Sequence, residues 1–511
     1  MKLEKEVAMT YRALFVLPAL NEVRRGNYRL ITYARFPPLS LLTLAGLTPA
    51  ERYEMLVRDD HIESAVVDDH VDLVAIQVYI SSADRAYELA DLYRRRGAKV
   101  VLGGLHATSM PHEAAQHADA VCIGPAEPVW SEILDDFEHD RLKPFYRGNP
   151  VGSAAMVPLP RRDLMNQLAY LVPNTMVTTR GCPHACAFCY KHGFWGERYF
   201  EARPMAAIEQ ELATFDDPVV FFLDDNLLGD RRHGKNLFSL LKGSGIVWQA
   251  AASLDVARDR AYLDQAREAG CRSLFVGFES LSSRELRQQR KHVNAVTDYA
   301  TAVRRFHDAG IMVNGSFVFG FDWDDRDVFA RTVEFAVENK LETASFHILT
   351  PFPGTSTFDE LERSGRLLHR QWAFYDTDHA VFRPRQMTPA ELERGFHDAY
   401  RDFLRYPSIL RRSAGLDGAI RRIAYNVGWM KVDPIWRAII RLGLMPFARR
   451  ILARALGAHE LPRSLAAFGR RSSYARLVAD EERAWGDEPD GGQPLWISRA
   501  WKDELREEVS L

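Results

Sequence analysis

The sequence predicts an α/β protein with two successive sets of parallel strands and a helical C-terminal region. Strand-like and helix-like segments alternate between residues 11 and 139, and they alternate again between residues 174 and 349. Such alternation is typical of parallel sheets that carry helices on their faces. Beyond residue 385 only helical periodicity continues, which indicates that the second sheet ends before this point.

Length, charge and the N-terminal sequence limit the function classes. A chain of 511 residues is too long for one ordinary core. We expect a doubly wound, Rossmann-like domain at residues 1–139, a linker at 140–168, a second strand–helix domain at 169–385 and a helical region at 386–511. The net charge of −3 offers no basic field for nucleic acid. Neither a signal peptide nor a membrane-spanning apolar run is visible, so we expect a cytoplasmic protein.

The first domain contains four predicted strands, at residues 11–18, 71–79, 99–102 and 118–123. Helices are expected after the first, second and fourth strands, whereas residues 106–113, after the third strand, are expected to form a loop. Doubly wound sheets bind ligands at the carboxyl ends of their strands. The residues that fall there are Ser81, Ser82, Gly103, Gly104 and Gly124. The glycines would let the backbone approach a flat ligand and the serines could hydrogen-bond it, but a plain turn and a helix cap explain the same residues.

Three of the five cysteines lie on one short segment, Arg180–Tyr190 (RGCPHACAFCY), as Cys182, Cys186 and Cys189. Three thiolates on a tight loop can hold three corners of an iron–sulfur cube, which normally has four cysteine ligands. The remaining iron is then open to a small molecule. One alternative is a zinc knuckle with a nearby histidine as fourth ligand, although zinc sites usually contain paired C-x2-C units. The other alternative is three unrelated buried cysteines.

Six predicted strands make up the second domain, and the first of them, residues 174–180, leads into the cysteine loop. The others are at residues 219–223, 247–253, 273–277, 311–320 and 343–349. Parallel barrels place their active sites at the carboxyl ends of the strands. The candidates at or near these ends are Asp224, Asp225, Glu279, Ser280, Gly315 and His347. Each also has a structural interpretation, as a helix cap, a turn or a packed histidine.

The cysteine spacing, with Phe188 before the last cysteine, resembles the radical S-adenosylmethionine (SAM) superfamily. The resemblance continues in order through the segments FFLDDNLLGD, FVGFESLS, FVFGFDWDD and HILTPFPGTSTFDEL. It implies a partial (β/α)6 barrel of the TIM type and a [4Fe-4S] cluster on the three cysteines. SAM would bind the open iron and be cleaved to a 5′-deoxyadenosyl radical.

The same resemblance assigns roles to the polar candidates. Phe188, Glu279, Ser280 and Gly315 would lie near SAM, whereas Asp224, Asp225 and His347 would face SAM or the substrate. It also implies a flavodoxin- or ferredoxin-type protein as electron donor.

The first domain resembles the cobalamin-binding domain found at the N-terminus of many radical SAM enzymes. The segments FPPLSLL and LGGLHATSMPHEA, the Ser-Ser turn and the strand before Gly124 carry this resemblance. It implies that Ser81, Ser82, Gly103, Gly104 and Gly124 contact cobalamin. Two features depart from the pattern. The D-x-H-x-x-G motif that supplies a histidine to cobalt is absent, and the usual Gly-Glu-Gly-Glu loop is Gly-Pro-Ala-Glu at residues 124–127.

The C-terminal region is basic and contains aromatic side chains. Residues 411–455 include ten Lys or Arg and two Asp, interleaved with aromatic and aliphatic residues. We expect helices that cover the barrel, with solvated arginines; the alternative is peripheral contact with an anionic membrane. Residues 487–493 (DEPDGGQ) are expected to form a spacer.

These features together predict a cobalamin-dependent radical SAM methyltransferase that acts on an unactivated carbon of a small molecule, such as a natural product, a lipid or a tetrapyrrole. One alternative is a cyclisation, ring rearrangement or aminocarboxypropyl transfer without methylcobalamin. Another is a non-catalytic cobalamin or electron carrier. An open cluster iron argues against the carrier, because electron transfer alone gains nothing from it.

Overall fold

Residues 11–147 form a six-stranded parallel sheet in the computed structural model, which describes residues 10–20, 36–67, 69–295, 297–416, 418–430, 439 and 442–458. Its strands lie in the order β2-β1-β3-β4-β5-β6. They are β1 (Tyr11–Leu17), β2 (Tyr53–Asp59), β3 (Leu73–Gln77), β4 (Lys99–Gly103), β5 (Ala120–Ile123) and β6 (Phe145–Arg147). The strand order reverses between β1 and β3, which is the switch point where sheets of this class bind ligands.

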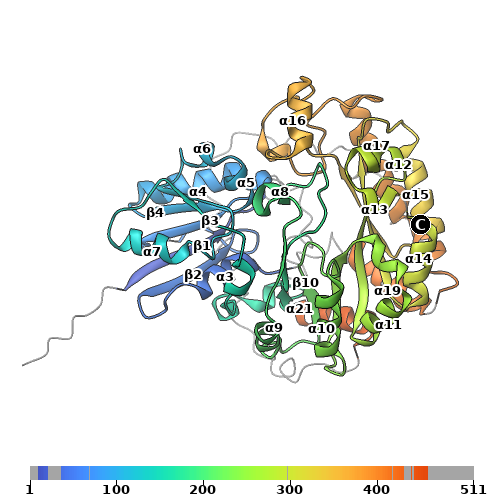
Figure 1. The fold of residues 1–511 in the computed structure, drawn as a ribbon, viewed down its shortest axis with the longest axis horizontal. Helices are drawn as coiled ribbons and strands as arrows, with labels where there is room; N and C mark the ends of the chain where they lie inside the picture. The colour runs from blue at the N-terminus through green and yellow to red at the C-terminus, as the bar shows by residue number, and fades with distance from the viewer. Residues whose placement is uncertain are drawn as a thin grey trace, which may run out of the picture.

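Helices cover both faces of this first sheet (Figure 1). On one face packs α4 (Ala83–Arg95), whose Tyr93 is completely buried. On the other face pack α3 (Leu39–Gly46) and α7 (Trp130–Glu138), where Trp130 is almost fully buried. The central strands are therefore apolar on both sides, and the predicted doubly wound domain is confirmed.

Several elements of this first sheet domain differ from the prediction. Residues 106–113 were expected to form a loop, and this was wrong, because they lie in α5 (Leu105–Ser109) and α6 (Pro111–Ala114). Strand β2 was missed because its buried residues alternate with more accessible ones at the sheet edge. Strand β6 lies within the expected linker and pairs in parallel with β5, so it extends the first sheet. The domain boundaries remain a prediction.

Residues 175–348 contain another six-stranded parallel sheet, in the order β14-β13-β12-β11-β10-β7. Its strands are β7 (Thr175–Met176), β10 (Val219–Phe222), β11 (Val247–Ala252), β12 (Cys271–Glu279), β13 (Met312–Phe319) and β14 (Thr343–Ile348). The helices between them lie on its outer side (Figure 1): α9 (Met205–Leu212), α10 (Arg231–Leu241), α11 (Arg260–Glu268), α12 (Ser283–Gln288), α13 (His292–Ala295), α14 (Tyr299–Asp308) and α15 (Val328–Glu338). With β14 and β7 at its two edges, the sheet is a partial barrel, as predicted.

The strand expected at residues 174–180 is divided in two. The short strand β7 pairs with β10 in the barrel sheet, whereas β8 (Thr179–Gly181) pairs antiparallel with β9 (Phe200–Ala202). The cysteine loop lies between β8 and β9. It is therefore carried on a hairpin that projects from the carboxyl edge of the barrel.

The C-terminal region packs around and beneath the barrel. Its helices are α17 (Pro389–Leu404), α18 (Tyr406–Ser413), α19 (Ala419–Met430) and α21 (Met445–Ala455), and α16 (Ser356–Arg363) precedes them in the segment after β14. Tyr425 and Met445 share a core with Val219, Val247 and Met312, which begin three of the barrel strands. The helical cover is therefore confirmed for the described residues; the spacer expected at residues 487–493 lies outside them. Among the helices that the structure describes, none is long and apolar enough to cross a bilayer.

Candidate functional site

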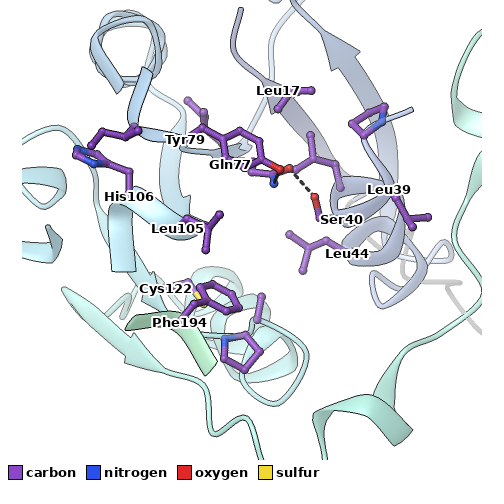
Figure 2. Close-up of a pocket in the computed structure, with 18 of the residues that line it drawn as sticks. Leu17, Leu39, Ser40, Leu44, Gln77, Tyr79, Leu105, His106, Cys122 and Phe194 are labelled. Carbon is purple, nitrogen blue, oxygen red and sulfur yellow. Dashed lines mark hydrogen bonds between the residues drawn. The ribbon is translucent and has the colours of Figure 1, made fainter. Parts of the chain in front are cut away.

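A cavity of about 720 Å³ opens at the carboxyl ends of the first sheet and extends to the mouth of the barrel. Residues of the first sheet domain and of the barrel part of the chain both line it. The first sheet contributes Gly103 and Gly104, the cysteine loop contributes Tyr190, and the segments after β14 contribute Phe352 and Thr377. Figure 2 shows the part of the cavity next to the first sheet, with Phe194 of α8 (Lys191–Trp195) on its border. A concave, mainly apolar space at this edge is the usual ligand site of such a fold.

The glycines of the first sheet shape one wall of the cavity. Gly104 has φ +100, and a Cβ there would lie 3.1 Å from the carbonyl oxygen of Val78. Gly124 has φ +79, and its N–H donates to the hydroxyl of Thr108 at 3.0 Å. Both positions favour glycine because L side chains rarely adopt this conformation. The wall therefore offers backbone at close range, and this fits the flat, bulky ligand expected for the domain.

Polar groups are few on this wall, and they are hydrogen-bonded to one another. The Ser40 hydroxyl donates to Oε1 of Gln77 at 2.5 Å, and Nε2 of Gln77 donates to the Tyr79 hydroxyl at 2.9 Å (Figure 2). Ser81 lines the cavity, as predicted. Ser82 is completely buried and donates to the carbonyl oxygen of Tyr79 at 3.3 Å. Ser82 therefore closes the turn, and a ligand contact from its hydroxyl remains a prediction.

The cysteine loop is fixed from two sides. The Ala187 N–H donates to the carbonyl oxygen of Gln289 at 3.0 Å, and the carbonyl of Ala187 accepts from the N–H of Thr357 at 3.3 Å. Inside the loop, the Cys189 N–H donates to the carbonyl of Cys186 at 3.1 Å. The loop is thus held against α12 and α16, with all three predicted cluster ligands as free thiols.

Burial shapes the chemistry of these thiols. It raises the pKa of Cys182, and it raises the pKa of both Cys186 and Cys189 to about 11. Such thiols are protonated at neutral pH and become thiolates when a metal binds them. Within the described ranges, no three His, Cys, Asp or Glu side chains converge on one point that could hold a single ion. The donor set is therefore three thiols spread along a loop, which suits a multi-iron cluster.

Glu279 occupies a strained position at the barrel edge. It has φ +65 at an irregularity in the pairing of β12 with β13, and its carboxylate forms an ion pair with Lys291. A Cβ on Gly277 would collide with both members of this pair. The backbone is fixed from outside, because Nδ2 of Asn294 donates to the Gly277 carbonyl at 2.8 Å. Strain maintained in this way is characteristic of functional positions.

A second ion pair lies at the other side of the cysteine loop. The ammonium of Lys191, the first residue of α8 (Lys191–Trp195), pairs with the carboxylate of Asp225, and Lys191 lines the cavity. Burial lowers the pKa of Lys191. The two lysines beside the cysteines, Lys191 and Lys291, were not predicted. Each lysine is distant in sequence from the carboxylate that it pairs with, so the sequence did not indicate either ion pair.

Asp224 lies beneath the loop and does not point into the cavity. Its Oδ1 accepts hydrogen bonds from the N–H groups and hydroxyls of Thr178 and Thr179, at 2.5–3.0 Å. The side chain is 3% exposed, and burial raises its pKa. The carboxyl therefore fixes the turn between β7 and β8, which carries the cysteine loop. A direct catalytic role for Asp224 remains a prediction.

His347 projects toward the barrel mouth. Its Nδ1 lies 3.2 Å from the hydroxyl of Thr377, a residue that lines the cavity. Burial lowers the pKa of the imidazole, so the ring is neutral at physiological pH. His347 is thus beside the cavity, where the predicted substrate contact requires it.

The remaining predicted SAM neighbours have packing roles in the structure. The Ser280 hydroxyl accepts from the Ser282 N–H at 3.1 Å. A Cβ on Gly315 would lie 2.9 Å from Cδ1 of Leu341, on the side of the barrel that faces the helices. Phe188 packs against the barrel core. Their contacts with SAM remain predictions.

Two contacts between the first sheet domain and the barrel part of the chain were also not predicted. Arg180, which precedes the first cysteine of the loop, forms an ion pair with Glu127 of the loop after β5. The indole of Trp372 donates to the Glu113 carboxylate at 2.9 Å, and Trp372 joins the core of the first sheet. These contacts tie the first sheet to the cysteine hairpin and to the segment after α16.

Comparisons with known proteins identify relatives of both the first sheet domain and the barrel. A family model described as the radical SAM superfamily matches residues 176–336, and one described as the B12 binding domain matches residues 32–134. The bacteriochlorophyllide d C-12(1)-methyltransferase of Chlorobaculum tepidum is 28% identical over 392 residues, which cover 74% of this chain and 85% of that protein. The hopanoid C-2 methylase of Rhodopseudomonas palustris is 26% identical over 357 residues, 66% of each chain.

Among solved structures, the radical SAM methyltransferase TsrM from Kitasatospora setae, with cobalamin and a [4Fe-4S] cluster bound, aligns with a TM-score of 0.56 and 17% identity. The alignment covers 86% of this chain and 100% of that chain. At this level of identity the likeness shows a shared fold.

Proposed function

Because the chain belongs to the radical SAM enzymes that carry a cobalamin-binding domain, we propose that it is a C-methyltransferase that acts on an unactivated carbon of a small molecule. The observation that carries this proposal is the shared cavity. The glycine-rich edge of the first sheet and the cysteine loop of the barrel line the same space. A ligand held by the first sheet would therefore face the site of radical formation.

The chain supplies separate binding groups for each cofactor. Three thiols would hold the cluster, those of Cys182, Cys186 and Cys189. The wall formed by Ser81, Gly103, Gly104 and Gly124 would hold cobalamin, and Phe188, Glu279, Ser280 and Gly315 would lie near SAM. When bound, the cluster and SAM supply hydrogen-atom abstraction and cobalamin supplies the methyl group.

The protein contributes positioning and the exclusion of water. The rings of Tyr190 and Phe352 meet edge to face at 5.0 Å between the cysteine loop and the barrel rim, and both line the cavity. Asp225, paired with Lys191, places a charged pair at the same rim. His347 is the nearby neutral imidazole, and we assign it a contact with the substrate. A concave, mainly apolar site limits the access of water to a reactive carbon radical.

We propose a large, apolar ring system as the substrate. The cavity wall is mostly aliphatic and aromatic, and Phe194, Trp195 and Tyr375 are among the aromatic residues that line it. Two related proteins are named for a bacteriochlorophyllide and a hopanoid, which are a tetrapyrrole and a polycyclic lipid. A substrate of either class would match this lining through its rings.

Anaerobic reconstitution with iron, sulfide and cobalamin tests the proposal. The protein should bind one corrin, cleave SAM to 5′-deoxyadenosine with a reductant, and transfer a methyl group from isotopically labelled SAM to an accepted tetrapyrrole or polycyclic lipid. Formation of 5′-deoxyadenosine without bound corrin would contradict methylation and favour cyclisation, rearrangement or aminocarboxypropyl transfer. Corrin binding without SAM cleavage would instead indicate a carrier.

Peripheral membrane contact is also proposed, through α21 and the residues before it. Four apolar side chains are exposed there by 44–70%, those of Leu442, Leu444, Phe447 and Ile451. Arg450 and Arg454 share this exposed face, while the opposite face packs on the barrel. Such a face suits an anionic lipid surface. Sedimentation with phosphatidylglycerol vesicles tests it: Phe447→Ser with Ile451→Ser should reduce the bound fraction, and unchanged binding would contradict the contact.

A further inference from the structure

We propose that the protein that donates electrons to the cluster binds an arginine-rich edge of α12, directly outside the cysteine loop. This edge consists of Arg284, Arg287 and Arg290, with Arg198 beside them. The inference rests on the proposed function, because only reductive cleavage of SAM requires a donor. It assigns a surface on this chain to a partner of stated chemistry, an acidic one-electron carrier of the flavodoxin or ferredoxin type.

Position is the first argument. The carbonyl of Gln289 accepts the N–H of Ala187 at 3.0 Å, and Ala187 follows Cys186 in the loop. The next residue after Gln289 is Arg290, whose side chain is 51% exposed. An exposed arginine therefore lies one peptide bond from a residue that is hydrogen-bonded to the cluster loop. Electron transfer rates fall steeply with distance, so a donor must approach the cluster at a place of this kind.

Charge is the second argument. Arg287 is exposed and, within the part of the chain that the structure describes, has no ion-pair partner. Arg290 pairs with Glu197 at 3.4 Å, and both side chains are more than half exposed, so the pair is weak. Arg198 follows Glu197 and is also exposed. Glu285, the acidic residue of α12, is buried on the opposite face. Four exposed arginines therefore face one exposed carboxylate, that of Glu197, and the edge is positive on a chain whose net charge is −3.

An apolar surface lies next to these charges. The guanidinium of Arg284 lies 3.7 Å from the ring centre of Trp323, which is 38% exposed. Leu281, also 38% exposed, begins the same segment. Arginine and tryptophan are the residues that dominate binding energy in protein interfaces. The edge thus has an aromatic contact point with a basic rim, which suits a transient complex steered by charge.

The electron balance is simple. The donor loses one electron, the cluster gains one, and no covalent bond forms or breaks between the two proteins. The arginines act only by holding the donor near the loop. They are positioning residues, and their effect should depend on salt and on the donor used.

The test compares charge reversal at two surfaces of the reconstituted enzyme. In the variant Arg287→Glu/Arg290→Glu, binding of a purified flavodoxin, followed by fluorescence anisotropy, should weaken about tenfold at low salt and lose much of its salt dependence. Bleaching of the cluster absorption by reduced flavodoxin should slow by a similar factor. Arg94→Glu/Arg95→Glu on α4 reverses the same number of charges on the first sheet and should change neither quantity. Arg287→Gln alone should give a smaller loss, without disturbing the loop beside Arg290.

Dithionite separates this proposal from the proposed function. It is a small reductant that needs no docking surface, so the α12 variants should still cleave SAM with dithionite at the wild-type rate. Unchanged flavodoxin binding and reduction in the α12 variants would overturn the docking surface, as would a larger loss in the α4 control. If the wild-type enzyme itself failed to cleave SAM with dithionite, the proposed function would fall and the docking inference with it.

Discussion

The two sheets present their carboxyl edges to one cavity, but they do so with different chemistry. The first sheet offers glycines with positive φ and a short chain of neutral hydrogen bonds from Ser40 to Tyr79. The barrel edge offers ion pairs, Glu279 with Lys291 and Asp225 with Lys191, and a strained backbone at Glu279. One edge is shaped for contact and the other is charged.

This difference matches what each edge has to bind. A large corrin is recognised by shape, and close approach of the backbone requires glycine. A cluster and a sulfonium-bearing amino acid carry charge, and a low-dielectric site makes charged groups strong. The two edges should therefore fail separately when they are altered, and variants on each side can break the comparison.

The largest effect is expected for Cys186→Ala on the charged side. Removing one of three ligands should leave a cluster that cannot hold SAM, so 5′-deoxyadenosine formation should fall to background and iron content should drop. Cobalamin binding should remain. Cys271→Ala is the matched control, because Cys271 is a fully buried core residue of β12. SAM cleavage that survives in Cys186→Ala would refute the cluster assignment.

The next effect is expected on the glycine side, for Gly104→Ala. The new Cβ would sit 3.1 Å from the Val78 carbonyl, in a backbone conformation with φ +100 and ψ −171 that is essentially restricted to glycine, at a cost of about 1–3 kcal/mol. Cobalamin affinity, measured by equilibrium dialysis, should fall about tenfold or more, while SAM cleavage with dithionite is retained.

Gly97→Ala provides the control for this substitution. Gly97 has φ +91 in the same sheet domain, but a Cβ there meets nothing within 4 Å. Alanine at this positive φ should also introduce backbone strain and lower stability, without a change in cobalamin affinity. Equal losses of affinity in both variants would show that strain, and not the cavity wall, sets cobalamin binding.

A smaller effect is expected for Glu279→Gln. The amide keeps the shape but removes the charge opposite Lys291, so SAM affinity should fall about tenfold by isothermal titration, and cobalamin affinity should stay unchanged. Glu268→Gln removes a carboxylate of another ion pair, with Lys242, which is exposed on both sides. It should leave SAM affinity intact. Loss of cobalamin binding in Glu279→Gln would mean that the two edges are not separate.

The parts of the site whose residues lie close together in the sequence could be predicted. The three cysteines lie within eight residues, and Gly103-Gly104 directly follows a strand, so spacing and periodicity were sufficient. Strand β2 was not predicted because edge strands mix exposed and buried residues.

The parts that depend on long-range contacts were beyond such reasoning. Asp224 has the position of a catalytic carboxylate, yet Thr178 and Thr179, more than 40 residues earlier, take up its Oδ1. The pair between Arg180 and Glu127 joins the cysteine hairpin to the loop after β5 of the first sheet. Only the packing of the two sheets brings such residues together.

The smallest expected effect is a pH dependence of stability at the rim of the barrel, away from both binding edges. Burial raises the pKa of both Glu285 and Asp324 to about 7, and the negative charge of an acidic neighbour, Asp322 for Glu285 and Glu285 for Asp324, contributes to this rise. Glu285 accepts the Trp323 N–H at 2.6 Å, and Asp324 accepts the N–H groups of Gly320 and Phe321 at 2.9–3.0 Å.

The sign follows from proton binding. The folded protein keeps these protons up to pH 7, whereas an unfolded chain releases them near pH 4. The folded state therefore binds more protons in this range, and the free energy of unfolding should decrease by about 1–3 kcal/mol as pH rises from 5 to 7.5. Urea unfolding of Glu285→Gln should show a flatter slope over this range. Asp325→Asn is the control, because Arg331 lowers the pKa of Asp325 and leaves it ionised throughout. An unchanged slope in Glu285→Gln would show that the carboxyl is already ionised in the folded protein, and that the barrel keeps its buried charges at the binding edge and the rim alike.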